Sequence, residues 1–297
     1  MLRHLVVPVD GSRASFNALP VAMRFAKEVD GHVTVIGVYD VDDVSLVRQA
    51  VEDHIARLGP PAAGSCRFVL SNEHPADVIV DIVSSEPDAL VVMSSHGRGR
   101  SAAVLGSTTD EVLRAIGGPL VAVGPSCDTE QSGPLGGPYV VPLDGSERAE
   151  RMLPIAATWS LQLGGTPWLV RCVPAATASI CRARYLSPLA RDVRRLTDAP
   201  VQYEVLEAEH AARPIVEFAQ LTRAPLIFMS THGRTGLARL RSGSVAAEVL
   251  RKSPCPVVMM RPQDLESESD AADHVAEPTR ATTADRRAAD VKEPALS

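Results

Sequence analysis

Three shortages limit what this chain of 297 residues can be. Aromatic residues make up only 4% of it, so a hydrophobic core must be built from Val, Leu, Ile and Ala, as in parallel sheets covered by helices. No apolar run approaches the roughly 18 residues of a membrane span. The net charge of −6 disfavours non-specific nucleic-acid binding, which requires a basic surface. We therefore expect a soluble protein with neither a membrane nor a nucleic acid as partner.

Cysteine and catalytic motifs are also scarce. The five cysteines are scattered and lack C-x-x-C spacing, which favours a reducing cytoplasm over a disulfide framework or a zinc site. The N-terminus has no signal-peptide pattern, because Asp10 interrupts its apolar run. No histidine pair has metal-ligand spacing, no serine lies in a G-x-S-x-G turn, and no glycine loop carries a P-loop lysine. The sequence thus predicts a cytoplasmic protein that is not an enzyme and holds no metal of its own.

What the chain does contain is a long internal repeat. V-V-P-V-D-G-S at Val6–Ser12 returns as V-V-P-L-D-G-S at Val140–Ser146, 134 positions later. Further along, Met93 opens the segment M-S-S-H-G-R and Met229 opens M-S-T-H-G-R, 136 positions apart. So few insertions accumulate between these matches that the repeat is a duplication of whole domains.

The repeat divides the chain. We assign one domain to residues 1–125 and the other to residues 139–262. Residues 126–138, rich in glycine and proline, are predicted to be a linker without secondary structure of their own. Residues 263–297 are acidic and carry isolated apolar residues, so we expect a disordered tail.

Within the first domain, short β-rich runs alternate with segments of helical or mixed periodicity. This alternation predicts an α/β fold with a parallel, doubly wound sheet and right-handed crossovers. The predicted elements are Leu5–Val9, Arg13–Val29, Val33–Val38, Val41–Leu58, Arg67–Leu70, Pro75–Ser84, Ala89–Met93, Asp110–Ile116 and Leu120–Val123. The last strands of the two domains, Leu120–Val123 and Val257–Met260, are predicted to pair with each other because unpaired apolar edges would aggregate.

Two features of each domain point to an anionic ligand. A strand leads into a glycine-bearing turn and then into a helix that begins near Gly243-Ser244 in the second copy and Gly106-Ser107 in the first. Free backbone N–H groups at such a helix start attract phosphate. An aspartate, Asp10 or Asp144, ends each first strand, at the sheet edge where open α/β folds bind ligands.

Other roles for these residues stay open at the level of sequence. Each aspartate could cap the following helix instead, and each serine could cap its helix without holding a ligand. The loops also differ, because nine residues separate Gly233 from Gly243 but only eight separate Gly97 from Gly106. Arginines of these loops, such as Arg234, could reach phosphate or remain solvated.

Taken together, these motifs and the terminal strands P-L-V-A-V and P-V-V-M-M resemble the universal stress protein family over both halves. The resemblance implies two tandem domains, each with a five-stranded parallel sheet of order 3-2-1-4-5, paired through their fifth strands as a pseudo-dimer. It also implies ATP binding where a loop of pattern G-x-x-G, nine residues, G-[ST] is present. In this chain a serine, Ser94 or Ser230, replaces the first glycine of that pattern.

The resemblance maps two candidate nucleotide sites onto the chain. The residues assigned to them are Pro8, Val9, Asp10, Val38, Met93, Ser94, Gly97, Gly106, Ser107 and Thr108 in the first half, and Pro142, Leu143, Asp144, Cys172, Met229, Ser230, Gly233, Arg234, Gly243, Ser244 and Val245 in the second.

The leading hypothesis is an ATP-binding stress-response sensor or regulator, with Mg accompanying the nucleotide. A nucleotide-free dimerisation or scaffold module and a slow ATPase are the alternatives. The sequence leaves open whether both sites fill and whether two chains form a homodimer.

Overall fold

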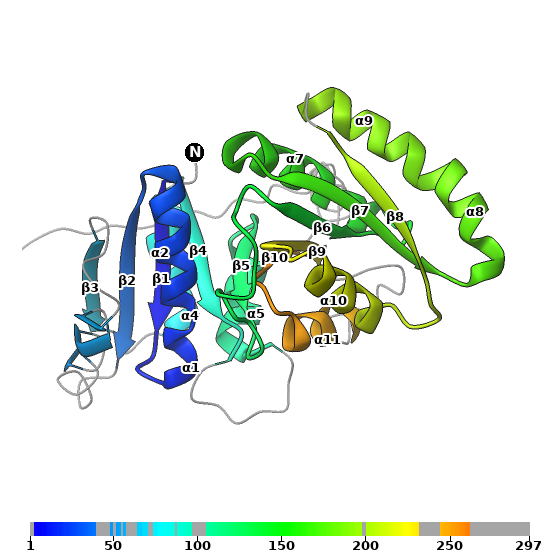
Figure 1. Ribbon diagram of the computed structural model, residues 1–297. Helices are drawn as coiled ribbons and strands as arrows, with labels where there is room; N and C mark the ends of the chain where they lie inside the picture. Colours follow the sequence, from blue (N-terminus) through cyan, green and yellow to red (C-terminus); the bar gives the residue numbers. More distant parts are fainter. Residues whose placement is uncertain are drawn as a thin grey trace, which may run out of the picture. The chain divides into compact units, whose positions relative to one another are not determined.

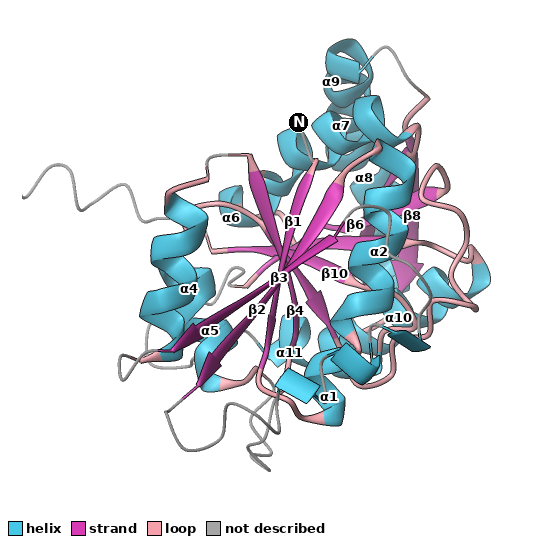
Figure 2. Ribbon diagram, turned by 90° about the vertical axis from the view of Figure 1, so that its left-hand side faces the viewer, coloured by secondary structure: helices cyan, strands magenta, loops and turns pink. Residues whose placement is uncertain are grey.

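Short runs rich in Val, Ile and Leu form strands, and the amphipathic segments between them form helices that cover both faces of one sheet (Figures 1 and 2). This computed structural model describes residues 3–39, 48–49, 52–54, 56–57, 64–70, 74–86, 88–96, 105–197, 200–231 and 244–261. All of them belong to one compact unit, Met1–Pro262. For residues 38–39 and 64–70 only the backbone is described.

The first half alternates strands and helices in the predicted order. Its elements are β1 His4–Val9, α1 Arg13–Phe16, α2 Ala18–Val29, β2 His32–Tyr39, β3 Gly64–Leu70, α4 Pro75–Ser84, β4 Ala89–Ser94, α5 Ser107–Ala115 and β5 Leu120–Val123.

The second half repeats this order, with a longer helical crossover before its third strand. Its elements are β6 Pro138–Pro142, α6 Glu147–Glu150, α7 Met152–Leu163, β7 Thr166–Val173, the 3-10 turn η1 Ala175–Thr177, α8 Ala178–Cys181, the π-helical turn η2 Arg182–Leu186, α9 Ser187–Thr197, β8 Gln202–Glu207, α10 Ala212–Leu221, β9 Leu226–Ser230, α11 Ser244–Lys252 and β10 Val257–Met260.

In the described part of the chain, the strands form a 10-stranded sheet of order β3-β2-β1-β4-β5-β10-β9-β6-β7-β8. Each half therefore has the strand order 3-2-1-4-5, with every neighbour inside a half parallel. The halves meet where β5 pairs antiparallel with β10, with Val121 opposite Val258 at the centre of the register. Both the fold and the pairing of the last strands are thus confirmed.

Several predicted boundaries were wrong. The helix expected over Arg13–Val29 breaks at Asn17 into α1 and α2, because Ser12 caps a separate first turn by accepting a hydrogen bond from Ser15 N at 3.1 Å. The helix expected from Asp110 begins three residues earlier, at Ser107. The third strand begins at Gly64 rather than Arg67, because its backbone pairs with β2 along that length. Most of the segment expected to be helical at 41–58 lies outside the described residues.

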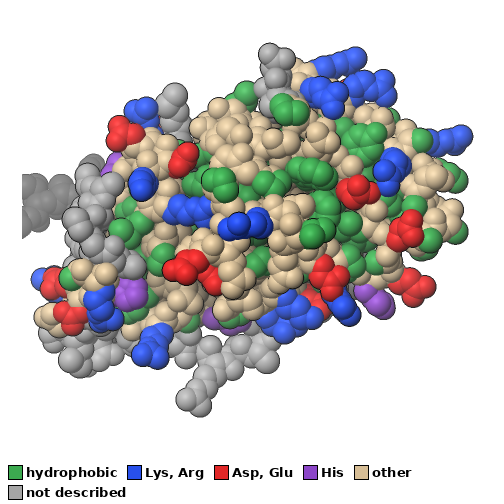
Figure 3. Space-filling view, viewed as in Figure 1, with side chains coloured by type: hydrophobic (Ala, Val, Ile, Leu, Met, Phe, Trp, Pro, Cys, Tyr) green, Lys and Arg blue, Asp and Glu red, His purple; other side chains and the backbone are tan. Residues whose placement is uncertain are grey.

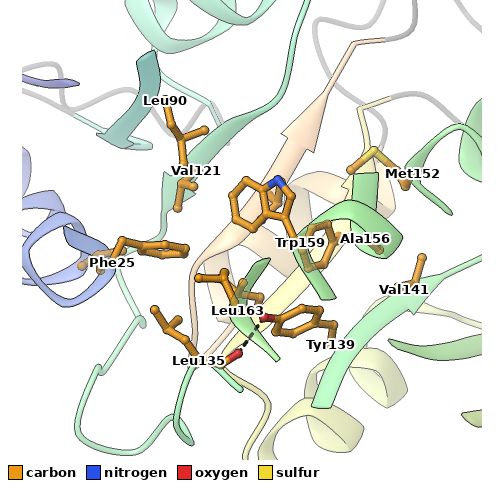
Figure 4. Close-up of a cluster of buried hydrophobic side chains, with 14 of the residues drawn as sticks. Phe25, Leu90, Val121, Leu135, Tyr139, Val141, Met152, Ala156, Trp159 and Leu163 are labelled. Carbon is orange, nitrogen blue, oxygen red and sulfur yellow. Dashed lines mark hydrogen bonds between the residues drawn. The ribbon is translucent and has the colours of Figure 1, made fainter. Parts of the chain in front are cut away.

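Residues 126–137, between the halves, form no helix or strand and are packed against both halves, whereas Pro138 already belongs to β6. Tyr139, fully buried at the start of β6, donates a hydrogen bond from its hydroxyl to Leu135 O at 2.7 Å (Figure 4). Leu135 is itself buried. This segment is therefore part of the folded unit.

Aromatic rings join the two halves across the sheet junction, although they are few. Phe25 on α2 meets Trp159 on α7 edge to face, with ring centroids 5.7 Å apart. Trp159 in turn meets Phe228 on β9 at 5.3 Å, and Tyr139 lies 5.3 Å from the same Phe228 ring. Edge-to-face pairs each add about 0.5–1.5 kcal/mol beyond the burial of their area.

We expect substitutions at two adjacent glycines to separate the effects of crowding and backbone strain. A methyl group at Gly165 would overlap the Tyr139 ring, so Gly165→Ala should lower the free energy of unfolding by about 1–3 kcal/mol. Gly164 has open space around it but a φ of +73°, so Gly164→Ala should cost about 1 kcal/mol. Urea denaturation of both variants measures these changes. An equal or smaller loss in Gly165→Ala would contradict the packing argument.

A half-buried histidine at the start of β1 should make stability depend on pH. His4 contacts Thr34 Oγ1 through Nε2 at 2.8 Å and Glu86 Oε2 through Nδ1 at 2.5 Å, and its ring stacks on His32. Burial is the largest cause that lowers the pKa of His4 below 6.5; Glu86 opposes it and His32 adds to it.

The sign of the pH effect follows from that lowered pKa. Below pH 6.5 the unfolded chain binds a proton more readily than the folded one, so the free energy of unfolding should fall between about pH 7 and pH 5. His4→Gln should flatten this decline in thermal melts recorded across the range. His210→Gln, at an exposed position, is the matched control and should leave the decline intact.

Candidate functional site

The described part of the second half contains a cavity of about 410 Å³ at the carboxyl ends of β6, β7 and β9. This is the edge where open α/β sheets bind ligands, since β6 and β9 lie side by side while their connections leave in opposite directions. The structure brings a large share of the predicted second-half residues together here: Pro142, Leu143, Asp144, Cys172, Met229, Ser230, Ser244 and Val245 all line the cavity.

Asp144 is held by the turn that follows β6. Its Oδ1 accepts hydrogen bonds from the backbone N of Ser146 at 2.9 Å and from the Ser146 hydroxyl at 2.6 Å. Gly145, between them, has a φ of +84°, which a glycine adopts without strain. Ser146, not Asp144, caps α6 by accepting from Ala149 N at 3.2 Å. The aspartate therefore shapes the turn and leaves the capping role to the serine.

The opposite side of the cavity is the start of α11. Ser244 is the first residue of this helix and is exposed, whereas Ser230 and Thr231, at the end of β9, are buried beside it. The backbone N–H groups of a first helical turn have no partner within the helix, and the helix dipole adds positive potential there. This end of the cavity suits an anion. The predicted loop residues Gly233, Arg234 and Gly243 lie outside the described residues.

Apolar side chains form the wall between these two polar ends. Met229 is buried on β9, and Cys172 on β7 is half-buried, with its Sγ 3.7 Å from Ala211 O. Burial raises the pKa of the Cys172 thiol to about 11, so it is neutral near pH 7. A neutral, polarizable wall next to a carboxylate is suited to a flat, partly polar ring.

The first half builds its turn and helix start in the same way. Ser12 N donates to Asp10 Oδ1 at 2.9 Å, while the Ser12 side chain caps α1. Gly106 precedes α5 and donates its N–H to Ser95 O at 2.7 Å; a side chain there would crowd that carbonyl. Thr109 donates to Ser94 O at 3.1 Å, which ties α5 to the end of β4.

The remaining first-half candidates occupy matching places. Pro8 and Val9 end β1, Met93 is buried on β4, and Ser107 and Thr108 open α5. Val38 lies on β2 opposite Val69 of β3 by its backbone register, and Gly97 lies outside the described residues.

His96 lies in the turn after β4, where its Nδ1 is 2.9 Å from the hydroxyl of the adjacent, buried Ser95. Among the residues that the structure describes, no group of three or more His, Cys, Asp or Glu could hold a metal ion. His232 lies outside those residues.

Comparison with known proteins settles the family. The profile of the Universal stress protein family matches residues 1–124 and 138–261. This chain belongs to the universal stress protein family. Universal stress protein Rv2005c of Mycobacterium tuberculosis is 29% identical to it over 293 residues, which cover 86% of this chain and 96% of that protein.

Two further matches differ in extent. Universal stress protein MJ0531 of Methanocaldococcus jannaschii is 44% identical over 61 residues, 20% of this chain and 35% of that protein, so the match spans about a third of its length. A crystal structure of a universal stress protein from Archaeoglobus fulgidus covers 88% of this chain and 99% of its own, with a TM-score of 0.63 and 18% identity. At that identity the likeness extends to the fold alone.

Two polar residues that line this cavity of the second universal stress protein domain, Arg171 and Thr231, were not among the predicted site residues. Arg171 lines the cavity from β7, and its guanidinium carbon lies 4.3 Å above the centre of the Tyr185 ring. Tyr185 donates its hydroxyl to Glu150 Oε1 at 2.8 Å; burial, followed by this bond, raises the pKa of Tyr185. Only its position in the sequence could have indicated Arg171 as a site residue, since it directly precedes Cys172 at a strand end and corresponds to Gly37 in the first half.

Gly145 should be the most restrictive position of this turn. A methyl group there would lie 2.9 Å from Arg171 Nη2 and would require a left-handed backbone. We expect Gly145→Ala to lower the free energy of unfolding by about 1–2 kcal/mol, chiefly through that backbone conformation. Gly145→Ala combined with Arg171→Ala, measured by urea denaturation, should retain most of the loss. Full recovery in the double variant would assign the cost to the arginine contact instead.

Proposed function

We propose that this universal stress protein binds an adenine nucleotide, ATP together with Mg, with one candidate site in each half. The binding would make it a nucleotide-dependent sensor or regulator of the stress response in the cytoplasm rather than an enzyme. Residues 1–125 and 139–262 would be the two binding domains and 126–138 their connection. The single observation that carries the proposal is the cavity of about 410 Å³ between Asp144 and the start of α11.

The two ends of this cavity have complementary chemistry for a nucleotide. Asp144 supplies a carboxylate that can accept hydrogen bonds from a base amine or a ribose hydroxyl. The N–H groups of the α11 start and the Ser244 hydroxyl supply donors for phosphate oxygens. The strands β9 and β7 flank β6, about 10 Å apart at ordinary strand spacing, a span that suits a nucleoside. Mg would arrive with the phosphates and neutralise part of their charge.

The described residues favour binding over turnover. Asp144 already accepts two hydrogen bonds through one oxygen, and burial keeps the thiol of Cys172 neutral, which makes it a poor nucleophile. A slow ATPase therefore stays the less supported alternative. The β5–β10 pairing favours a second candidate, a scaffold whose function is the pairing itself.

Two pairs of variants test nucleotide binding by calorimetric titration with Mg-ATP. Asp144→Ala should weaken the second site about tenfold, whereas Asp192→Ala, an exposed position on α9, should change nothing. Proline is tolerated at the first position of a helix but has no backbone N–H. Ser244→Pro should therefore weaken binding more than Ser244→Ala does.

Stoichiometry completes this test. Wild-type protein should bind nucleotide at up to two sites per chain and melt at a higher temperature when Mg-ATP is added. If the purified chain carries no adenine nucleotide and millimolar Mg-ATP leaves its melting temperature unchanged, the proposal is wrong and the scaffold function is favoured.

A further inference from the structure

The segment that joins the halves, Gly124–Gly137, lies in a groove at the amino end of the second half's strands. Asp128 N donates to Pro254 O at 2.8 Å, and Gly133 N donates to Arg223 O at 2.7 Å. From the first half, Arg24 on α2 donates to the Ser132 hydroxyl at 2.8 Å and to Gly133 O. This segment, which contains several hydrogen-bonded turns, is thus held through its backbone, and Arg24 contacts it from the first half.

The duplication places an equivalent groove in the first half. α7 replaces α2 as its cover, so that Thr158 stands where Arg24 stands and Trp159 where Phe25 stands, each 134 positions later. Likewise Gly118 and Pro119 correspond to Cys255 and Pro256, 137 positions earlier. The antiparallel pairing of β5 with β10 puts the described strands and helices of the two halves at equivalent places on either side of the junction.

At that equivalent place the structure has a cavity of about 370 Å³, bounded by the amino ends of β4 and β5 and by α7. Its lining includes Glu86, Asp88, Gly118, Thr158, Trp159 and Gln162. No described segment of the chain crosses it as Gly124–Gly137 crosses the other groove. Its lining shares no residue with that of the nucleotide cavity, so the two do not overlap.

The two grooves differ in charge. In the occupied groove the guanidinium of Arg24 donates to Ser132 and Gly133, while the Asp128 carboxylate accepts hydrogen bonds within its own turn. The cavity has an uncharged Thr158 at the matching position and two carboxylates, Glu86 and Asp88, on its wall. Glu86 contacts His4, whose lowered pKa leaves it neutral near pH 7, so this contact does not cancel the Glu86 charge. A ligand peptide for this groove should therefore be basic.

We propose that this cavity is a docking groove for a basic segment of another protein, which would occupy it as the inter-domain segment occupies the equivalent groove of the second half. Backbone groups of the turn before β5 and of the start of β4 would hold the peptide main chain. Glu86 and Asp88 would select Lys or Arg side chains, and the Trp159 side of α7 would cover apolar ones. This surface would give a universal stress protein a partner site independent of its nucleotide sites.

A peptide derived from the chain itself tests the groove. The probe is a fluorescent peptide with the sequence of residues 126–135, carrying Cys127→Ser, Asp128→Lys and Glu130→Lys; the control peptide keeps both acidic residues. Fluorescence anisotropy with the full-length protein should show saturable binding of the basic peptide only. Added Mg-ATP should not displace it, which separates this result from the success or failure of the nucleotide proposal.

Substitutions that change the charge of the groove then test whether the peptide binds there. Thr158→Arg gives this groove the arginine that Arg24 supplies in the other one. It should therefore weaken binding of the basic peptide about tenfold and permit binding of the acidic peptide. Glu86→Gln should also weaken the basic peptide, whereas Leu161→Ala, 63% exposed on the same helix, should not. Thermal melts confirm that each variant is folded.

Three results would overturn the proposal. These are no saturable binding of the basic peptide, equal binding of both peptides, or unchanged affinity in folded Thr158→Arg and Glu86→Gln proteins. If the same basic peptide bound equally to Leu161→Ala and to wild type but lost affinity in the two groove variants, the cavity is its site.

Discussion

Hydrogen bonds between β5 and β10 turn two five-stranded sheets into one, and much of the remaining structure depends on them. Each of these short apolar strands would otherwise be an exposed edge, with unpaired backbone groups and a tendency to associate with other chains. Their pairing leaves only β3 and β8 as edges of the described sheet. It also brings α2 against α7, where Phe25 and Trp159 meet, so the largest hydrophobic cluster extends through both halves.

The same pairing makes the two copies unequal. One polypeptide segment connects them, and it fills a groove on one side of the junction only, where Arg24 holds it. No described segment occupies the matching groove of the other copy, so the residues of that groove need not fit one. Thr158 there lines a cavity together with Glu86 and Asp88, whereas Arg24 contacts the inter-domain segment. The second-half cavity also differs from the matching place in the first half, because Arg171 stands where the first half has Gly37.

Much of the fold could be predicted from local sequence. The buried strands read as short apolar runs, and the helix Pro75–Ser84 and the strand Leu120–Val123 were predicted to the residue. Boundaries failed where a side chain or a neighbour decides them, as at Asn17, which separates the turn capped by Ser12 from α2, or at Gly64, which joins β3 only because β2 lies beside it. For the candidate site, turn chemistry identified Asp144 and Ser244, whereas Arg171 carries no motif and becomes visible only when β7 is folded.

The sequence alone determined the duplication, the order of strands and helices, the Asp-Gly-Ser turns and the serine at each helix start, because these are encoded by residues close together in the chain. The tertiary structure decided what depends on contacts between distant segments. It showed that the inter-domain segment is packed and held by Arg24, and that Thr158 and Glu86 line one cavity. Those residues come together only after the two sheets have joined edge to edge, and no local sequence pattern encodes that joining.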